Sequence, residues 1–115
     1  MTGAATVGTM LSDDMIRAVL AFRDERDWAQ FHSPQNLAKS IAIEAGELVE
    51  CYQWADSADP DRVASELADV LTYGILLADR LGLDLDTIVR DKLEESRAKY
   101  PVEKARGKST KYDAL

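Results

Sequence analysis

Apolar residues recur along this chain with the three- and four-residue spacing of α-helices, and no stretch shows the alternation typical of a β-strand. The first helical segment starts after Ser12, a good N-cap followed by two aspartates, and runs to about Trp28. A loop is expected over residues 29–32. Two further start signals, Ser33-Pro34 and Asp59-Pro60, each place a capping side chain before a proline at the first helical position. The pattern therefore predicts three successive helices.

The second and third of these helices are long and amphipathic. On the second, one face collects the apolar residues Leu37, Ile41, Ala45, Leu48, Tyr52 and Ala55. The third ends at Gly82, and a fourth follows from Asp84 or Asp86 to about Lys99, before Pro101. We therefore predict an all-α protein, a four-helix bundle formed by one domain over residues 12–115, with a flexible arm over residues 1–11 and a polar C-terminal tail.

Composition and charge narrow the class of protein. The 115 residues carry a net charge of −7, so the chain lacks the basic surface that a nucleic-acid polymer requires of its partner. No apolar run approaches the roughly 20 residues needed to cross a bilayer, which argues against a membrane partner. Cys51 is the only cysteine and the first residues do not resemble a secretory signal, so we expect a cytoplasmic protein.

Two pairs of acidic residues lie inside the predicted helices, Glu44 with Glu47 and Glu66 with Asp69. Residues three apart on a helix are about 60° from each other, so each pair points two carboxylates in one direction. Packed side by side, the two helices would gather four carboxylates, and a hard divalent cation such as Mg²⁺ or Mn²⁺ would relieve their repulsion. The alternative is an ordinary solvated face, but the neighbours of these acids are apolar and few lysines accompany them.

A second group of chemically useful side chains precedes the second long helix. Trp28 and Phe31 supply flat apolar surface, while Gln30, His32 and Asn36 supply donors and acceptors. Such a segment could stack on a nucleobase and read its edge. The alternative is that the two aromatic side chains belong to the core. His32 is the only histidine and no cysteine cluster accompanies it, which argues against zinc.

Aromatic and basic residues extend these two groups. Trp54 continues the face of the first acidic pair, and Tyr73 lies one turn after the second pair. The segment 101–115 holds four basic residues against two acidic ones, a net charge of +2. These cations could close over a polyphosphate, or the segment could be a solvated tail.

Several motifs together carry a resemblance to a known family. The acids fit the pattern E-x-x-E, a variable gap, then E-x-x-D, and the segments 26–32 (RDWAQFH), 44–48 (EAGEL), 99–101 (KYP) and 111–112 (KY) accompany them. With these motifs, over roughly residues 15–115, the chain resembles the all-α nucleotide pyrophosphohydrolases, and within them the MazG-like dCTP pyrophosphatases. The four-acid pattern is shared across the superfamily, whereas the tryptophan segment and the tail are more specific to this branch.

The resemblance implies hydrolysis of a nucleoside triphosphate between its α and β phosphates, with dCTP or a 5-substituted dCTP as the expected substrate. It implies that Glu44, Glu47, Glu66 and Asp69 hold Mg²⁺, which Mn²⁺ could replace, and that Glu47 also acts on the attacking water. It assigns the base and sugar to Trp28, Trp54 and Tyr73, with His32 nearby, and the phosphates to Lys92, Arg97, Lys108, Lys111 and Tyr112, with Lys39 as a weaker candidate. Ser96 replaces an asparagine of the family pattern, and its hydroxyl can still donate a hydrogen bond to the substrate.

Two alternatives to this function remain open. Another enzyme of the superfamily, such as a dUTP hydrolase or the phosphoribosyl-ATP hydrolase of histidine synthesis, would share the acids and differ in the base pocket. A non-catalytic helical interaction module would need neither the acids nor a base pocket. For assembly, apolar stripes on more than one helix face predict a homo-oligomer, and the resemblance implies a tetramer whose site is partly shared between subunits.

Overall fold

The computed structural model describes residues 11–115, in a chain that divides into two compact units, one ending at Leu83 and the other spanning Asp84–Leu115. The first unit contains α2 (Asp13–Glu25), the 3₁₀ turn η1 (Trp28–Phe31), α3 (Pro34–Glu50) and α4 (Pro60–Leu81). The second contains α5 (Leu85–Lys99), α6 (Val102–Ala105) and the 3₁₀ turn η2 (Tyr112–Ala114).

The all-α class with four long helices is confirmed, since the described residues form only helices, turns and connections. The extent of the single domain stays a prediction. Residues 1–10 of the predicted arm lie outside the described residues. Among the helices of residues 11–115, none combines the length and the apolar character that crossing a membrane demands.

All four long helices start where the sequence predicted, because a side chain caps each first turn. Ser12 Oγ and Ser33 Oγ each accept a hydrogen bond from the backbone N–H three residues further on, at 3.1 Å. Asp59 accepts from the N–H two residues on at 3.2 Å, and Asp84 from the N–H three residues on at 3.0 Å. These bonds satisfy N–H groups that the helix itself leaves without partners.

Two helix ends differ from the prediction. α2 stops three residues before Trp28, because Asp27 adopts the left-handed backbone conformation with φ of 53°. The expected loop that follows is the 3₁₀ turn η1. α3 stops before Tyr52 and Ala55, so these residues leave the predicted helix face. Three successive backbone bonds from residue i to residue i−3 tighten residues 51–53 into a turn there.

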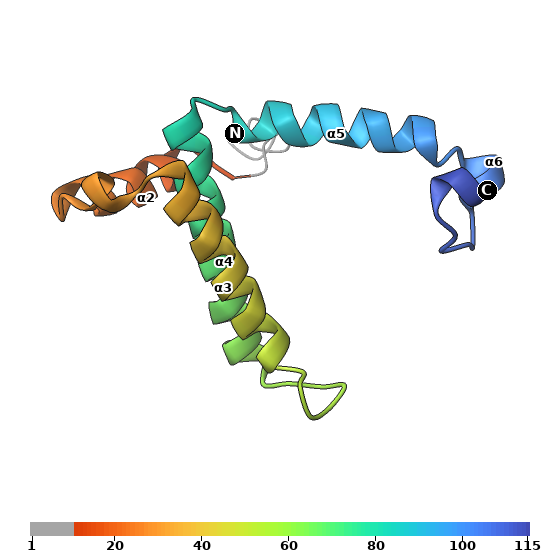
Figure 1. Cartoon of the computed structure of the whole chain (residues 1–115), viewed down its shortest axis with the longest axis horizontal. Helices are drawn as coiled ribbons and strands as arrows, with labels where there is room; N and C mark the ends of the chain where they lie inside the picture. The colour runs from red at the N-terminus through yellow and green to blue at the C-terminus, as the bar shows by residue number, and fades with distance from the viewer. Residues whose placement is uncertain (1–10) are drawn as a thin grey trace, which may run out of the picture. The chain divides into compact units, whose positions relative to one another are not determined.

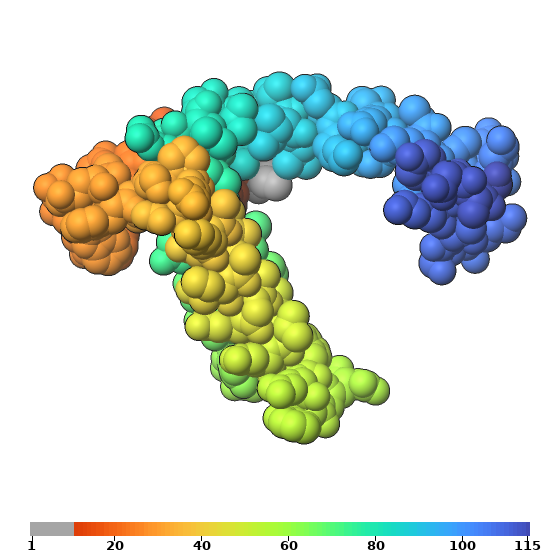
Figure 2. Space-filling view, in the orientation of Figure 1, coloured from red at the N-terminus to blue at the C-terminus, as the bar shows by residue number. Residues whose placement is uncertain are grey.

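Within the first unit, α3 and α4 lie side by side and run in opposite directions (Figure 1). Their contact is the most extensive helix–helix contact among the described residues, and α2 packs on α4. The most buried side chains are Leu37 of α3 together with Ile75, Leu76 and Ala78 of α4. The core therefore lies near the start of α3 and the end of α4, while the connection between these helices lies at the far end of the pair from α2 (Figure 2).

In the second unit, the polar segment that follows α5 folds against the end of that helix. The rings of Tyr100 and Tyr112 meet edge to face with centroids 6.2 Å apart, and Lys99 Nζ lies 4.8 Å from the centre of the Tyr112 ring. Lys99 also pairs with Glu95 at 3.1 Å. The C-terminal tail is thus polar, as predicted, but contains α6 and η2.

Candidate functional site

Carboxylates from two helices meet between α3 and α4. One oxygen from each of Glu44, Glu66 and Asp69 lies within 4.8 Å of the other two. Glu44 and Glu66 are half-buried, whereas Asp69 is exposed. The antiparallel packing of the two helices therefore brings the two predicted acidic pairs together.

Glu47, the fourth predicted acid, lies beside Glu44 and Glu66, close enough to share a carboxyl proton with either. Three effects raise the pKa of Glu44 to about 7. The largest is the side-chain hydrogen bond with Glu47, the next is burial, and the last is the negative charge of Glu47, Asp69 and Glu66. Burial first, and then Glu47, raise the pKa of Glu66 as well. We refer to these four residues as the acid cluster. At neutral pH, without a cation, the acid cluster is partly protonated.

The acid cluster has buried oxygens that lack partners. Oε2 of Glu44 and Oε2 of Glu66 are buried, and neither accepts a hydrogen bond from a donor group. A buried acceptor costs free energy until a shared proton or a cation satisfies it. Carboxylate oxygens are the ligands that hard divalent cations prefer. The residues present therefore fit a divalent metal ion.

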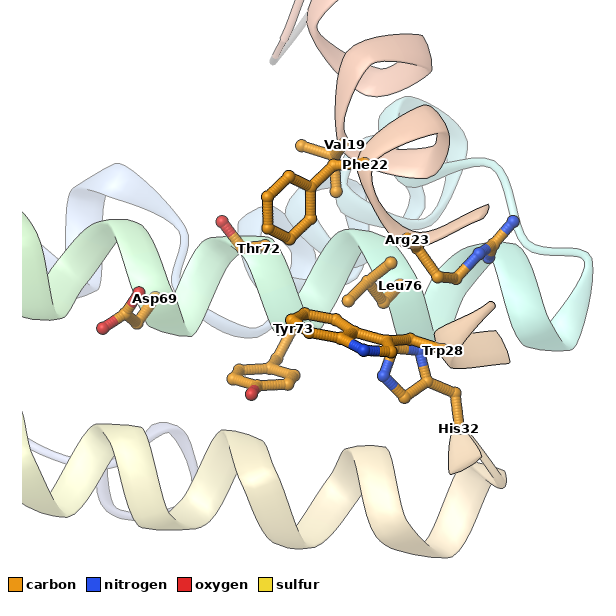
Figure 3. Close-up of a pocket in the computed structure, with 9 residues that line it drawn as sticks. All are labelled: Val19, Phe22, Arg23, Trp28, His32, Asp69, Thr72, Tyr73 and Leu76. Carbon is orange, nitrogen blue, oxygen red and sulfur yellow. The ribbon is translucent and has the colours of Figure 1, made fainter. Parts of the chain in front are cut away.

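A pocket of about 180 Å³ lies next to the acid cluster (Figure 3). Residues of α2, η1, the connection after η1 and α4 line it: Val19, Phe22, Arg23, Trp28, His32, Asp69, Thr72, Tyr73 and Leu76. Figure 3 shows Trp28, His32 and Tyr73 grouped together, with Asp69 nearer the start of α4. Because Asp69 belongs to both the pocket and the acid cluster, a molecule in the pocket would lie against the carboxylates.

His32 brings hydrogen-bonding capacity into this apolar pocket. Its Nδ1 is buried and has no hydrogen-bond partner. Burial first, and the positive charge of Arg23 second, lower the pKa of His32 below its ordinary value of 6.5. The imidazole is therefore neutral at pH 7, when one ring nitrogen donates and the other accepts. This arrangement can pair with the polar edge of a flat ring.

Sequence reasoning missed the α2 wall of the pocket, formed by Val19, Phe22 and Arg23. The guanidinium of Arg23 donates hydrogen bonds to Asp24 at 2.8 Å and to Asp79 at 2.7 Å, and its side chain is only 14% exposed. The ring of Phe22 meets Trp28 edge-on with centroids 5.5 Å apart. The signal available was the spacing of three and four residues, which places all three side chains on one face of α2.

Three side chains from the predicted aromatic group do not line the pocket. Gln30 Nε2 donates to the backbone oxygen of Asp27 at 2.9 Å, and Asn36 Nδ2 donates to the backbone oxygen of Phe31 at 3.1 Å. These two amides hold η1 in place instead of facing a ligand. Phe31 is 62% exposed, so it lies outside the core, and it does not line the pocket.

The other predicted site residues belong neither to the acid cluster nor to the lining of the pocket. Trp54 is 89% exposed in the turn after α3, and Lys39 is exposed on α3. The second unit holds Lys92, Ser96, Arg97, Lys108, Lys111 and Tyr112. There, Lys92 and Arg97 pair with neighbouring glutamates at 3.4 and 3.0 Å. The roles assigned to these residues stay predictions.

Comparison with known proteins finds related sequences and a related structure. The model of the MazG-like family matches residues 39–115, a span that contains all four acids. The chain is similar to dCTP pyrophosphatase 1 of Rattus norvegicus, with 41% identity over 113 residues, and of Homo sapiens, with 40%. Each alignment covers 90% of this chain and 66% of the relative, so the chain spans just under two thirds of these relatives' length.

The chain is also similar to a pyrophosphatase from Archaeoglobus fulgidus whose crystal structure is known. The two share 37% sequence identity with a TM-score of 0.70, over 77% of this chain and 91% of that chain. The pocket residues of α2 and η1 lie ahead of the span that the family model matches, whereas the acid cluster lies inside it.

Proposed function

This chain belongs to the MazG-like family, and on that premise we propose that it hydrolyses a nucleoside triphosphate to the monophosphate and pyrophosphate. We propose dCTP or a 5-substituted dCTP as the preferred substrate, which would make the protein a nucleotide-pool sanitising enzyme. Similarity to proteins named dCTP pyrophosphatase 1 and to a named pyrophosphatase supports this. The observation that carries it is the meeting of carboxylates from α3 and α4 beside a pocket with aromatic walls.

The proposed cofactor is Mg²⁺, with Mn²⁺ as a substitute. Glu44, Glu66 and Asp69, with Glu47 beside them, would hold it, and the partnerless buried oxygens of Glu44 and Glu66 favour a cation. When bound, such an ion offsets the charge of the phosphates and of the leaving group. Membership of the MazG-like family and the acidic donor set both support dependence on a divalent metal ion.

Glu47 is the proposed general base. It lies among the acids, within proton-sharing distance of Glu44 and Glu66. In its ionised form it can accept a proton from a water molecule held beside the α phosphate. The water oxygen then bonds to the α phosphorus, the bond to the bridging oxygen breaks, and that oxygen leaves with the pyrophosphate.

The pocket is the proposed site for base and sugar. Trp28 and Tyr73 supply flat surface on which a pyrimidine can stack. The neutral imidazole of His32 can accept a hydrogen bond from the amino group that distinguishes cytosine from uracil. If Tyr73 packs against the sugar, a ribose hydroxyl would be left unpaired there, at a cost of about 1–3 kcal/mol, which favours deoxyribose.

We also propose that the protein assembles into a homo-oligomer, specifically a tetramer. Large apolar side chains such as Ile43, Val49 and Trp54 are 62%, 67% and 89% exposed, and a partner copy would cover them. In such an assembly Trp54 would reach a base pocket across the subunit boundary. The same proposal includes phosphate contacts by Lys39 and by six residues of the second unit: Lys92, Ser96, Arg97, Lys108, Lys111 and Tyr112. It also includes a cytoplasmic location.

The test measures products from a panel of nucleotides with and without Mg²⁺. We expect dCMP and pyrophosphate from dCTP, and an activity that a chelator abolishes. Glu47→Gln should largely remove turnover with the helices intact, because an amide accepts no proton and carries no charge. Glu25→Gln, on the exposed end of α2, is the matched control. Full activity of Glu47→Gln would contradict the mechanism, whereas preference for dUTP or purines would contradict only the cytosine assignment.

A further inference from the structure

The groups of the candidate site follow one another in a fixed order along α4. Tyr73 and Asp69 line the pocket, Glu66 joins Asp69 in the acid cluster, and Arg62 comes one turn nearer the start of the helix. At 1.5 Å per residue, Arg62 lies about 6 Å from Glu66 and about 10 Å from Asp69 along the helix axis. Residues four apart share a face, so Arg62 points to the same side as Glu66.

Arg62 forms an ion pair with a residue of α3 that lies beyond the acid cluster, on the side away from the pocket. Its Nη2 lies 3.9 Å from Oε2 of Glu50, which follows Glu47 by three residues. Both side chains are more than half exposed, at 51% and 61%, and the separation is too long for a hydrogen bond. A solvated pair without a hydrogen bond exchanges partners readily. The guanidinium is therefore available to another anion at this end of the acid cluster.

A nucleoside triphosphate has its own linear order of base, sugar, and α, β and γ phosphates. With the base in the pocket and the bond between the α and β phosphates at the acid cluster, the remaining phosphates extend away from the pocket, toward the start of α4. On the proposed function, therefore, we infer that Arg62 binds the β and γ phosphates, which leave together as pyrophosphate. Its planar guanidinium matches two phosphate oxygens at once.

A positive charge in this position would offset part of the negative charge of the site. The acids and the triphosphate are both negative, and cleavage leaves additional negative charge on the bridging oxygen that departs with the pyrophosphate. Arg62 lies about 6 Å from Glu66 along the helix axis, so its positive charge acts on anions held at this end of the acid cluster. The same charge would stabilise the departing group where the carboxylates would otherwise repel it.

The experiment compares inhibition by the two products, pyrophosphate and dCMP, in the presence of Mg²⁺. For Arg62→Gln we expect pyrophosphate inhibition to weaken by about tenfold, inhibition by dCMP to stay unchanged, and Arg62→Lys to recover part of the loss. Arg80→Gln, near the other end of α4, is the matched control and should change neither. Glu50→Gln breaks the same ion pair but keeps the guanidinium, so it should tighten pyrophosphate inhibition.

The outcomes separate this inference from the proposed function. If the unaltered protein hydrolyses no nucleotide, both are overturned. If it hydrolyses dCTP and Arg62→Gln leaves pyrophosphate inhibition unchanged, this inference alone is overturned. Equal losses in Arg62→Gln and Glu50→Gln would mean that the ion pair is only structural. A loss confined to dCMP inhibition would mean that the nucleotide lies in the opposite direction.

Discussion

Metal binding at the acid cluster is expected to release protons, because the metal-free carboxyls share them at neutral pH. The pKa of Glu44 is raised to about 7, so at pH 7 about half of the molecules carry a proton on this group. A divalent cation needs ionised ligands and displaces that proton. Glu44 alone should therefore release about 0.9 proton per site at pH 6, about 0.5 at pH 7 and about 0.1 at pH 8.

Isothermal titration with MgCl₂ or MnCl₂, repeated in buffers of different ionisation enthalpy, counts these protons directly. The apparent affinity should rise with pH up to about 7 and level off above it. Glu66, whose pKa is also raised, adds to the count. In Glu44→Gln the contribution of Glu44 disappears, which makes this variant the control. A metal that binds at pH 6 without proton release, or a count that does not fall toward pH 8, would refute the reasoning.

Three further outcomes are expected. Leu37→Ala, at a side chain only 1% exposed, should destabilise the protein by about 3 kcal/mol in thermal unfolding, whereas Gln35→Ala, at an exposed position of the same helix, should cost under about 0.5 kcal/mol. The NMR titration of His32, the only histidine, should give a pKa below 6.5 that rises in Arg23→Met; an unchanged value would exclude the role of Arg23. Trp28→Ala should raise KM for dCTP about tenfold with the same products, and an unchanged KM would exclude Trp28 from substrate binding.

The starts of the helices could be predicted from the sequence because local chemistry determines them. Ser12, Ser33, Asp59 and Asp84 cap the helices that follow through side-chain bonds to nearby N–H groups. The ends were harder, since neither glycine nor proline marks the end of α3. The left-handed conformation of Asp27 was likewise hidden, because that conformation usually belongs to glycine.

For the site, the sequence indicated the acids but not how the two helices align. That Glu44 meets Asp69 and Glu66 depends on the register between α3 and α4, which long-range packing determines. The composition of the pocket likewise depends on long-range packing. Arg23 looks like an ordinary surface cation in the sequence, and its bonds to Asp24 and Asp79 explain why it lies in a wall beside His32.

The residues of the candidate site lie on two kinds of secondary structure, long α-helices and a short 3₁₀ turn. The acids stand on the paired helices α3 and α4, whereas Trp28 and His32 stand on or just after the short turn η1, which local hydrogen bonds hold. Substitutions can accumulate in such a turn without shifting the carboxylates. On the proposed function, natural selection could therefore alter which base is accepted while hydrolysis persists, so descendants of one ancestral scaffold could diverge in the nucleotide they remove.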